Sequence, residues 1–194
     1  MTASLAKDQG FSLVELMVTI AIAGILAGIS IADFSQRWGQ ERLLGASRTL
    51  HSWLDEQRRF AIQKAGTCQL MINTTAASLE ASPATIELAP SPAPVTTPNI
   101  CAGQAPLLIR NTVSNGGSIQ LSVSPAKAQA IRFSFRGLSQ GVSTDASLPN
   151  SVELRLKLPN ISRERCVKVV NPLGMIRNGT ASNSESSCSY SQSF

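Results

Sequence analysis

A single carboxylate lies inside a long apolar run near the start of this 194-residue chain. Between residues 11 and 32, Glu15 is the one charged side chain. A helix of that length extends about 33 Å, enough to cross a hydrocarbon core of roughly 30 Å. A charge at the centre of such a helix costs on the order of 2.5–3.5 kcal/mol, so Glu15 needs a partner. The run itself offers none, so the partner would have to come from another molecule.

Four cysteines, Cys68, Cys101, Cys166 and Cys188, form the second group with possible chemistry. They lack Cys-x-x-Cys spacing and His51 is the single histidine, so no zinc site is indicated. In an exported domain an even number of cysteines indicates disulfides, and three pairings can be drawn. We favour Cys68–Cys101 and Cys166–Cys188, because each closes a loop with few other constraints and the second would hold a Ser- and Asn-rich tail. Free buried thiols are the alternative.

The remaining residues do not indicate an enzyme. The chain has one histidine, no paired acids in a plausible site and no glycine-rich phosphate loop, so no catalytic residue, cofactor, metal or small-molecule substrate is expected. The formal net charge is +5, and the chain from residue 103 onward contains ten lysines and arginines but four acids. A basic face attracts phosphate groups without sequence specificity, but charged outer faces are also ordinary for strands.

One long helix is expected to carry the apolar run. No proline interrupts residues 11–64, and beyond residue 32 the pattern becomes amphipathic. We expect residues 11–32 to be a transmembrane or filament-core half, and residues 33–66 a half that packs on a sheet and stops at Gly66. We expect His51 in the core or at an interface. The apolar face recurs at three- and four-residue steps: Leu43, Ala46, Leu50, Trp53, Leu54, Gln57 and Ala61.

Short strands are expected in the rest of the chain, which makes residues 67–194 a β-rich head and the fold class α+β. Strict alternation places Ile131, Phe133 and Phe135 on one face of a half-buried antiparallel strand. Residues 81–106 hold six of the ten prolines, which predicts an exposed insertion, tethered if Cys101 is bridged. The candidate strands are 68–73, 85–88, 107–111, 118–123, 130–135, 152–158 and 165–170, with turns at 115–117 and 148–150.

Residues 1–32 resemble the class III signal of type IV pilins and type II secretion pseudopilins. The resemblance rests on Gly10 before the aromatic Phe11, on Glu15 at the fifth position after the cut, and on the apolar helix that follows. It implies a pilin-like fold and a leader at 1–10, which a prepilin peptidase removes between Gly10 and Phe11 before methylating Phe11. It also implies a single inner-membrane pass with a periplasmic head, then packing with other pilins in a pilus or pseudopilus. An uncleaved signal or a plain membrane anchor is the alternative.

Three later segments (131–137, 152–156 and 165–177) resemble the sheet region of GspH/FimT-type minor pilins and pseudopilins. This resemblance implies a minor pilin that helps to initiate assembly or caps the tip, or alternatively a type II secretion minor pseudopilin. In some FimT-like proteins a Gly-Arg-x-Arg turn binds DNA, whereas this chain reads Gly174-Met175-Ile176-Arg177 and lacks the first arginine. Lys168 and Arg177 are the candidate contacts of a third, less favoured alternative, a DNA-binding competence pilus subunit.

Overall fold

The structure is a computed structural model that describes residues 12–80, 85–88, 95–109, 118–142, 147–148, 151–159, 161–182 and 187–190. The predicted cleavage site at Gly10 and Phe11 lies outside these residues, as does the predicted turn at 115–117. The chain divides into two compact units, Met1–Trp38 and Gly39–Phe194. They are described separately below.

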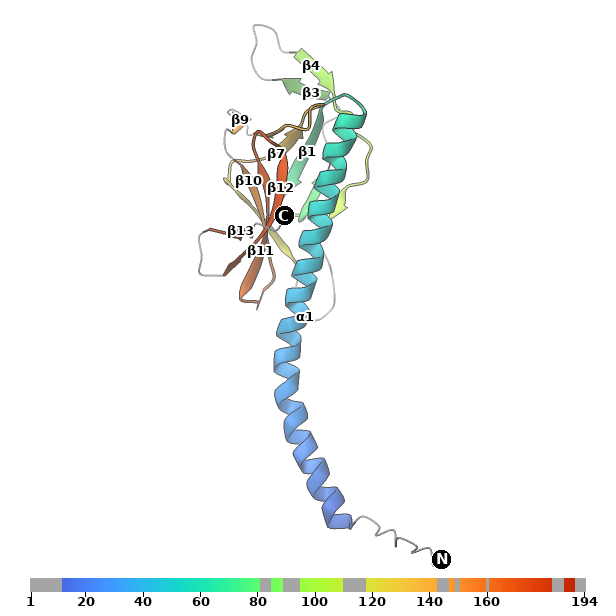
Figure 1. Cartoon of the computed structure of the whole chain (residues 1–194), viewed down its shortest axis with the longest axis vertical. Coiled ribbons are helices and arrows are strands. Elements are labelled where there is room, and N and C mark those ends of the chain that lie inside the picture. Colours follow the sequence, from blue (N-terminus) through green and yellow to red (C-terminus); the bar gives the residue numbers. More distant parts are fainter. Residues whose placement is uncertain are drawn as a thin grey trace, which may run out of the picture. The chain divides into compact units, whose positions relative to one another are not determined.

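Helix α1 (Leu13–Gln63) begins in the first unit and ends in the second (Figure 1). In the first unit its large apolar side chains between Leu13 and Leu26 are exposed, each by 52–74%. This stretch therefore has an apolar surface that is not covered within its own unit. The residues concerned are Leu13, Val14, Leu16, Met17, Val18, Ile20, Ile22, Ile25 and Leu26.

In the second unit, α1 buries the face that the sequence predicts. Leu50, Leu54 and Ala61 are completely inaccessible, and the amide of Gln57 is buried among them. Ala46 and Trp53 pack against the same core from its margin. Because these positions follow three- and four-residue steps, they form one stripe along the helix. The predicted amphipathic half of the helix is thus confirmed.

Helix α1 ends at Gln63, three residues before the predicted stop at Gly66. Ala65 takes the left-handed conformation, with a φ of 49°, and Gly66 N donates a hydrogen bond to Ala61 O at 3.1 Å. This arrangement closes the last turn by satisfying a terminal carbonyl. Gly66 is required for a different reason: a Cβ atom there would approach Ile100 Cγ2 to 2.5 Å.

The described strands form two main sheets and a separate hairpin, and neighbouring strands within each are antiparallel. The six-stranded sheet has the order β5 (Leu107–Leu108), β2 (Ser78–Glu80), β1 (Cys68–Asn73), β7 (Ala130–Phe133), β8 (Ser139–Val142) and β9 (Ser147–Leu148). The five-stranded sheet has the order β13 (Ser189–Tyr190), β12 (Met175–Ser182), β11 (Arg163–Val170), β10 (Val152–Lys157) and β6 (Gln120–Ser124). The hairpin pairs β3 (Thr85–Leu88) with β4 (Val95–Pro98).

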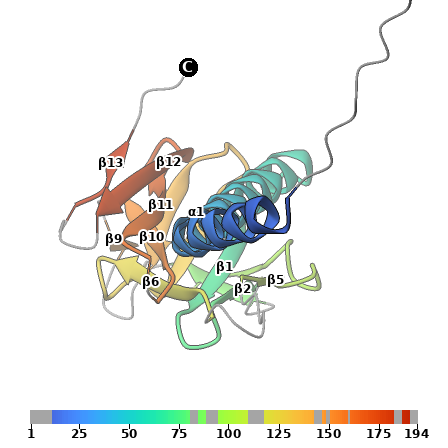
Figure 2. The same ribbon diagram turned by 90° about the horizontal axis from the view of Figure 1, so that it is seen from below.

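The core of the second unit is shared by α1 and both main sheets. Leu54 of α1, Phe133 of β7 and Leu154 of β10 belong to one buried cluster. Figure 2 shows the helix against the sheets in a view turned by 90°. Two side chains of α1 also make polar contacts outside the helix: His51 contacts β12, and Arg58 contacts the turn between β7 and β8. The predicted α+β class, a long N-terminal helix on antiparallel sheets, is confirmed.

Most of the predicted strands exist, with one error of orientation. Strands β1 and β3 have the predicted bounds, and β10 ends one residue earlier than predicted. Strand β7, however, ends at Phe133, because Gly137 N donates to Ser134 O at 2.8 Å and turns the chain. Phe135 is consequently 50% exposed instead of facing the core with Ile131 and Phe133. The predicted strand at 107–111 is observed only as β5, and residues 110–111 lie outside the described residues.

Candidate functional sites

Glu15 begins the apolar helix as part of a local cap. Ser12 precedes the first helical residue, and its Oγ accepts a hydrogen bond from Val14 N at 3.3 Å. Glu15 Oε2 accepts in return from Ser12 N at 3.4 Å. This reciprocal pattern is a capping box, which satisfies two of the amides left open at a helix start. The expectation that the run offers Glu15 no partner is therefore wrong, although a bond of 3.4 Å is long and leaves the carboxylate exposed.

The sequence predicts a membrane-spanning helix over residues 11–32. Within the part of the chain that the structure describes, no helix is both long enough and apolar enough to cross a membrane.

Both favoured disulfides are present. Cys68 pairs with Cys101 and Cys166 with Cys188, across Cα–Cα distances of 5.2 and 6.4 Å. The first joins the start of β1 to the end of the proline-rich segment, as predicted for a bridged Cys101. The second joins β11 to the segment that leads into β13, the last described strand.

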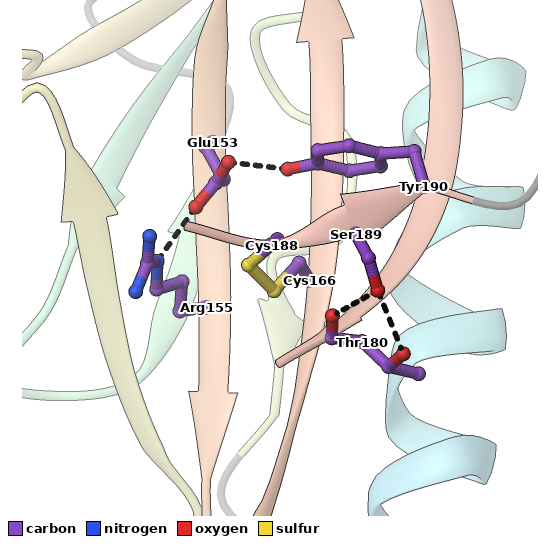
Figure 3. Close-up of a disulfide and its surroundings, with 7 residues drawn as sticks. All are labelled: Glu153, Arg155, Cys166, Thr180, Cys188, Ser189 and Tyr190. Carbon is purple, nitrogen blue, oxygen red and sulfur yellow. Dashed lines mark hydrogen bonds and ion pairs between the residues drawn. A yellow bond between two sulfur atoms is a disulfide. The ribbon is translucent and has the colours of Figure 1, made fainter. Parts of the chain in front are cut away.

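A polar network surrounds the second disulfide on the outer face of the five-stranded sheet (Figure 3). Side chains alternate along β10, so Val152 and Leu154 point into the core while Glu153 and Arg155 lie on the opposite face. Glu153 Oε1 accepts from Arg155 Nε at 2.6 Å, and Glu153 Oε2 accepts from the hydroxyl of Tyr190. The last described strand is thus tied to β10 by a side-chain hydrogen bond, and the segment leading into it is tied to β11 by the disulfide.

Burial raises the pKa of Tyr190, and the hydrogen bond to Glu153 and the charge of that carboxylate raise it further. The positive charge of Arg155 opposes this shift in pKa. The phenol therefore remains a neutral donor, which is the form that the Glu153 carboxylate requires.

The two candidate DNA contacts are neighbours. Lys168 of β11 lies opposite Arg177 of β12 in the strand register, and the Lys168 Nζ lies 5.1 Å from the centre of the Tyr190 ring. These three side chains line a surface pocket of about 390 Å³. The pocket continues over the turn that joins β11 to β12; its other lining residues are Ser151, Val170, Asn171, Leu173 and Met175.

Glu153 and the sulfurs of Cys166 and Cys188 lie within 4.8 Å of one another. Because both sulfurs form the disulfide, neither is a thiolate that could bind a metal ion. The arrangement offers a metal one carboxylate, which Arg155 and Tyr190 already engage.

His51 packs at an interface, as expected, with Nε2 3.3 Å from Ile176 O of β12. Arg58 lies about two helical turns further along α1. Its Nε donates to Gly137 O at 2.9 Å. These two contacts fix the helix to β12 and to the turn between β7 and β8. Neither residue lines the pocket of Lys168 and Arg177.

Comparison with protein families finds a match to the prokaryotic N-terminal methylation motif over residues 5–31. This motif is confined to the N-terminal segment of the chain. The resemblance predicted for its N-terminal segment is thereby confirmed. No curated protein sequence matches this chain significantly. Among solved structures it is similar to the type IV minor pilin FimU of Pseudomonas aeruginosa, with 12% identity, a TM-score of 0.48, and coverage of 77% of this chain and 94% of that one. We draw no conclusion from a likeness of that degree.

The residues of this site that sequence reasoning missed are Tyr190, Glu153 and Arg155. Glu153 and Arg155 fall in the predicted strand 152–158, and alternation along that strand places them opposite the buried Val152 and Leu154. What the sequence does not reveal is that the tail folds back over that face. One signal was available: Tyr190, the single tyrosine, lies two residues after a cysteine predicted to be bridged.

Proposed function

We propose that this chain is a minor pilin, which enters a type IV pilus through its N-terminal helix and there helps to initiate assembly or caps the tip. The methylation motif over residues 5–31 carries the proposal. The exposed apolar side chains between Leu13 and Leu26 support it, since so large an apolar surface is unfavourable in water. Lipid covers that surface before assembly, and the helices of neighbouring subunits cover it afterwards.

In this proposal the precursor sits in the inner membrane with its head in the periplasm. A prepilin peptidase cuts between Gly10 and Phe11 and methylates the new amine. Glu15 of one subunit then pairs with the amine of Phe11 in the next. The long bond from Ser12 N leaves the Glu15 carboxylate able to accept a second donor. Desolvation offsets much of the attraction in a buried ion pair, so the pair sets the register between subunits more than it stabilises them.

The Glu15 pairing is tested with Glu15→Gln in the full chain, expressed in its native host. Sheared filaments and membranes are separated, and the protein is measured in each. We expect normal amounts in membranes and a reduced share in filaments, because the amide keeps the shape of the side chain but not its charge. Glu41→Gln, which removes an exposed acid of the same helix, is the matched control. Equal entry of both variants into filaments would reject the pairing.

Processing is tested separately by mass spectrometry of the N-terminus. The mature protein should begin at Phe11 and carry one methyl group. Gly10→Arg should retain residues 1–10, whereas Gln9→Arg, which adds the same charge one residue earlier, should be processed. A shortened product from Gly10→Arg would refute the assigned cut.

The pseudopilin alternative uses the same helix, so deletion phenotypes must separate it from the pilus subunit. Loss of twitching supports the proposal, and loss of protein secretion supports a type II secretion minor pseudopilin. We do not propose DNA binding, because Lys168 and Arg177 are two isolated cations and not a track that follows successive phosphates.

A further inference from the structure

The outer face of the five-stranded sheet carries positive charge that the fold does not balance. Lys168 and Arg177 lie directly opposite each other on β11 and β12, where like charges repel. The two cations on β10, Arg155 and Lys157, both form ion pairs, at 2.6 and 3.6 Å. Among the residues that the structure describes, no carboxylate forms an ion pair with Lys168 or Arg177. An anionic group brought by another molecule would relieve this repulsion.

The nearest carboxylate is already engaged. Glu153 lies opposite Lys168 in the register of β10 and β11. One of its oxygens accepts from Arg155 Nε and the other from the Tyr190 hydroxyl. The Lys168 ammonium instead lies over the Tyr190 ring, which fixes its position beside the pocket.

An apolar ledge forms the other side of the same pocket. Leu173 and Met175 line it and are 56% and 38% exposed. The turn that carries them is anchored from two directions: Gly174 N donates to Val170 O at 2.9 Å, and Ser139 N donates to Pro172 O at 2.8 Å. The ledge is therefore a fixed surface of the head, with two cations immediately beside it.

We infer that this pocket docks an acidic segment of a partner protein, with a carboxylate between Lys168 and Arg177 and an adjacent apolar side chain on Leu173 and Met175. Charge complementarity identifies the partner's chemistry, since carboxylates satisfy guanidinium and ammonium groups. The same surface of a second copy would instead bring two further cations to the site. The inference concerns the head and does not depend on the helix-mediated assembly proposed above.

A nucleic acid fits this surface less well. Strands without sequence preference bind along a cationic groove with aromatic rings on which bases stack. Here the two cations end against apolar side chains, and Lys168 covers the face of the Tyr190 ring. The apolar ledge would gain nothing from a phosphate backbone, whereas it suits a leucine or phenylalanine next to an acidic residue.

The test measures fluorescence anisotropy with the full chain in a neutral detergent and three labelled probes. The first is a short peptide with two glutamates flanked by leucines, the second has glutamines in place of the glutamates, and the third is a single-stranded oligothymidine. Lys168→Gln and Arg177→Gln remove the cations one at a time, and Lys127→Gln removes an exposed cation outside the pocket. Leu173→Ser removes the ledge, and Leu108→Ser, at a residue 69% exposed, is its control.

We expect the glutamate peptide to bind and the glutamine peptide to fail. Each pocket variant should weaken binding about tenfold, equivalent to about 1.4 kcal/mol, while both controls bind as the unsubstituted chain does. Circular dichroism verifies that every variant is folded. The inference is overturned if no peptide binds, or if the pocket and control variants behave alike. Binding of the oligothymidine alone, lost with Lys168→Gln and Arg177→Gln, overturns it in favour of a nucleic-acid site.

Discussion

The hydroxyl of Tyr190 donates a hydrogen bond to Glu153 Oε2, 37 residues earlier in the chain. It thereby ties the last described strand, β13, to β10 across β12 and β11, and β11 is the strand that carries Cys166. This hydrogen bond lies on the outer face of the sheet, beside the disulfide of Cys166 and Cys188 (Figure 3). Since Tyr190 is the only tyrosine, its ionisation can be followed by absorbance without interference from another phenol.

This relationship predicts that the stability of the head falls as the pH rises above about 10. The unfolded chain releases the Tyr190 proton near its usual pKa of 10.0, whereas in the folded chain that pKa is raised. Above pH 10 the folded state therefore holds more protons than the unfolded state, and the free energy of unfolding decreases with pH. Urea unfolding at pH 8 and pH 11 measures the effect, and absorbance near 295 nm measures the phenolate directly.

Tyr190→Phe is the matched variant for that experiment. It should lose about 1–2 kcal/mol at pH 8, because a hydrogen bond to a charged group is removed. Its stability should then fall less between pH 8 and pH 11 than that of the unsubstituted chain. A phenolate signal that appears near pH 10 in the folded protein would contradict the raised pKa of Tyr190.

Removal of the second disulfide should release the same contact. Cys166 and Cys188 are 22 residues apart, and in the chain-entropy model a loop of that size contributes about 3 kcal/mol. In the doubly substituted Cys166→Ser, Cys188→Ser chain we also expect the pKa of Tyr190 to fall towards its usual value, because β13 is no longer held against β10. Thermal unfolding and the absorbance titration measure the two effects separately.

The other disulfide provides the control. Cys68→Ser with Cys101→Ser opens a loop of 33 residues and should destabilise the head by about 4 kcal/mol in the same model. It should leave the Tyr190 titration unchanged as long as the head is folded. Equal effects of both double variants on the titration would show that the disulfide at Cys166 does not hold the tail in place.

The turn between β11 and β12 predicts that alanine at Gly174 destabilises the head more than alanine at Gly103 does. Gly174 and Gly103 both have positive φ angles, of 68° and 90°, so alanine is strained at either position by about 1–2 kcal/mol. At Gly174 an added Cβ would also lie 2.1 Å from Gly137 O, the carbonyl that accepts from Arg58. At Gly103 it would meet nothing within 4 Å.

Gly174→Ala should therefore cost at least about 2 kcal/mol more than Gly103→Ala, because backbone must move in the first case only. Chemical denaturation of the two variants gives the comparison. Similar losses in both would mean that the turn containing Gly174 adapts without disturbing Gly137.

The sequence predicted the buried face of α1 and several strands because burial there follows a regular period. Leu50, Leu54 and Ala61 repeat at helical steps, and Val152 and Leu154 alternate along β10, so each local pattern already identifies the core face. The disulfide pairing was predicted because each bridge closes a loop with few other constraints and the second holds a Ser- and Asn-rich tail.

Strand β12 was missed because its residues favour turns. It contains Asn178 and Gly179, and both residue types are depleted in strands. The structure gives the reason for the glycine: a Cβ at Gly179 would approach Cδ1 of Tyr190 to 2.7 Å. Gly179 is needed for its contact with the distant Tyr190, so its residue type does not follow strand propensity. Local sequence pattern therefore predicts neither β12 nor the pocket beside it.

A last prediction concerns Asn99, whose side chain bonds the backbone of β1 at Gln69, where β2 does not pair with it. Its Oδ1 accepts from Gln69 N at 3.0 Å, and its Nδ2 donates to Gln69 O at 2.9 Å. Asn99 is 4% exposed, so both backbone groups of Gln69 would remain buried without these partners. Asn99→Ala should therefore cost about 2–4 kcal/mol, the penalty for leaving buried polar groups of the backbone unsatisfied.

Asn73→Ala is the control, because the Asn73 Oδ1 also accepts from a backbone amide, that of Ala76 at 2.9 Å, but in an exposed turn. Water replaces that bond, so its loss should cost below about 1 kcal/mol. Urea unfolding of both variants decides the matter. If Asn99→Ala costs no more than Asn73→Ala, then β1 does not depend on Asn99 for its outer hydrogen bonds, and Cys101 alone fixes the end of the proline-rich segment to the sheet.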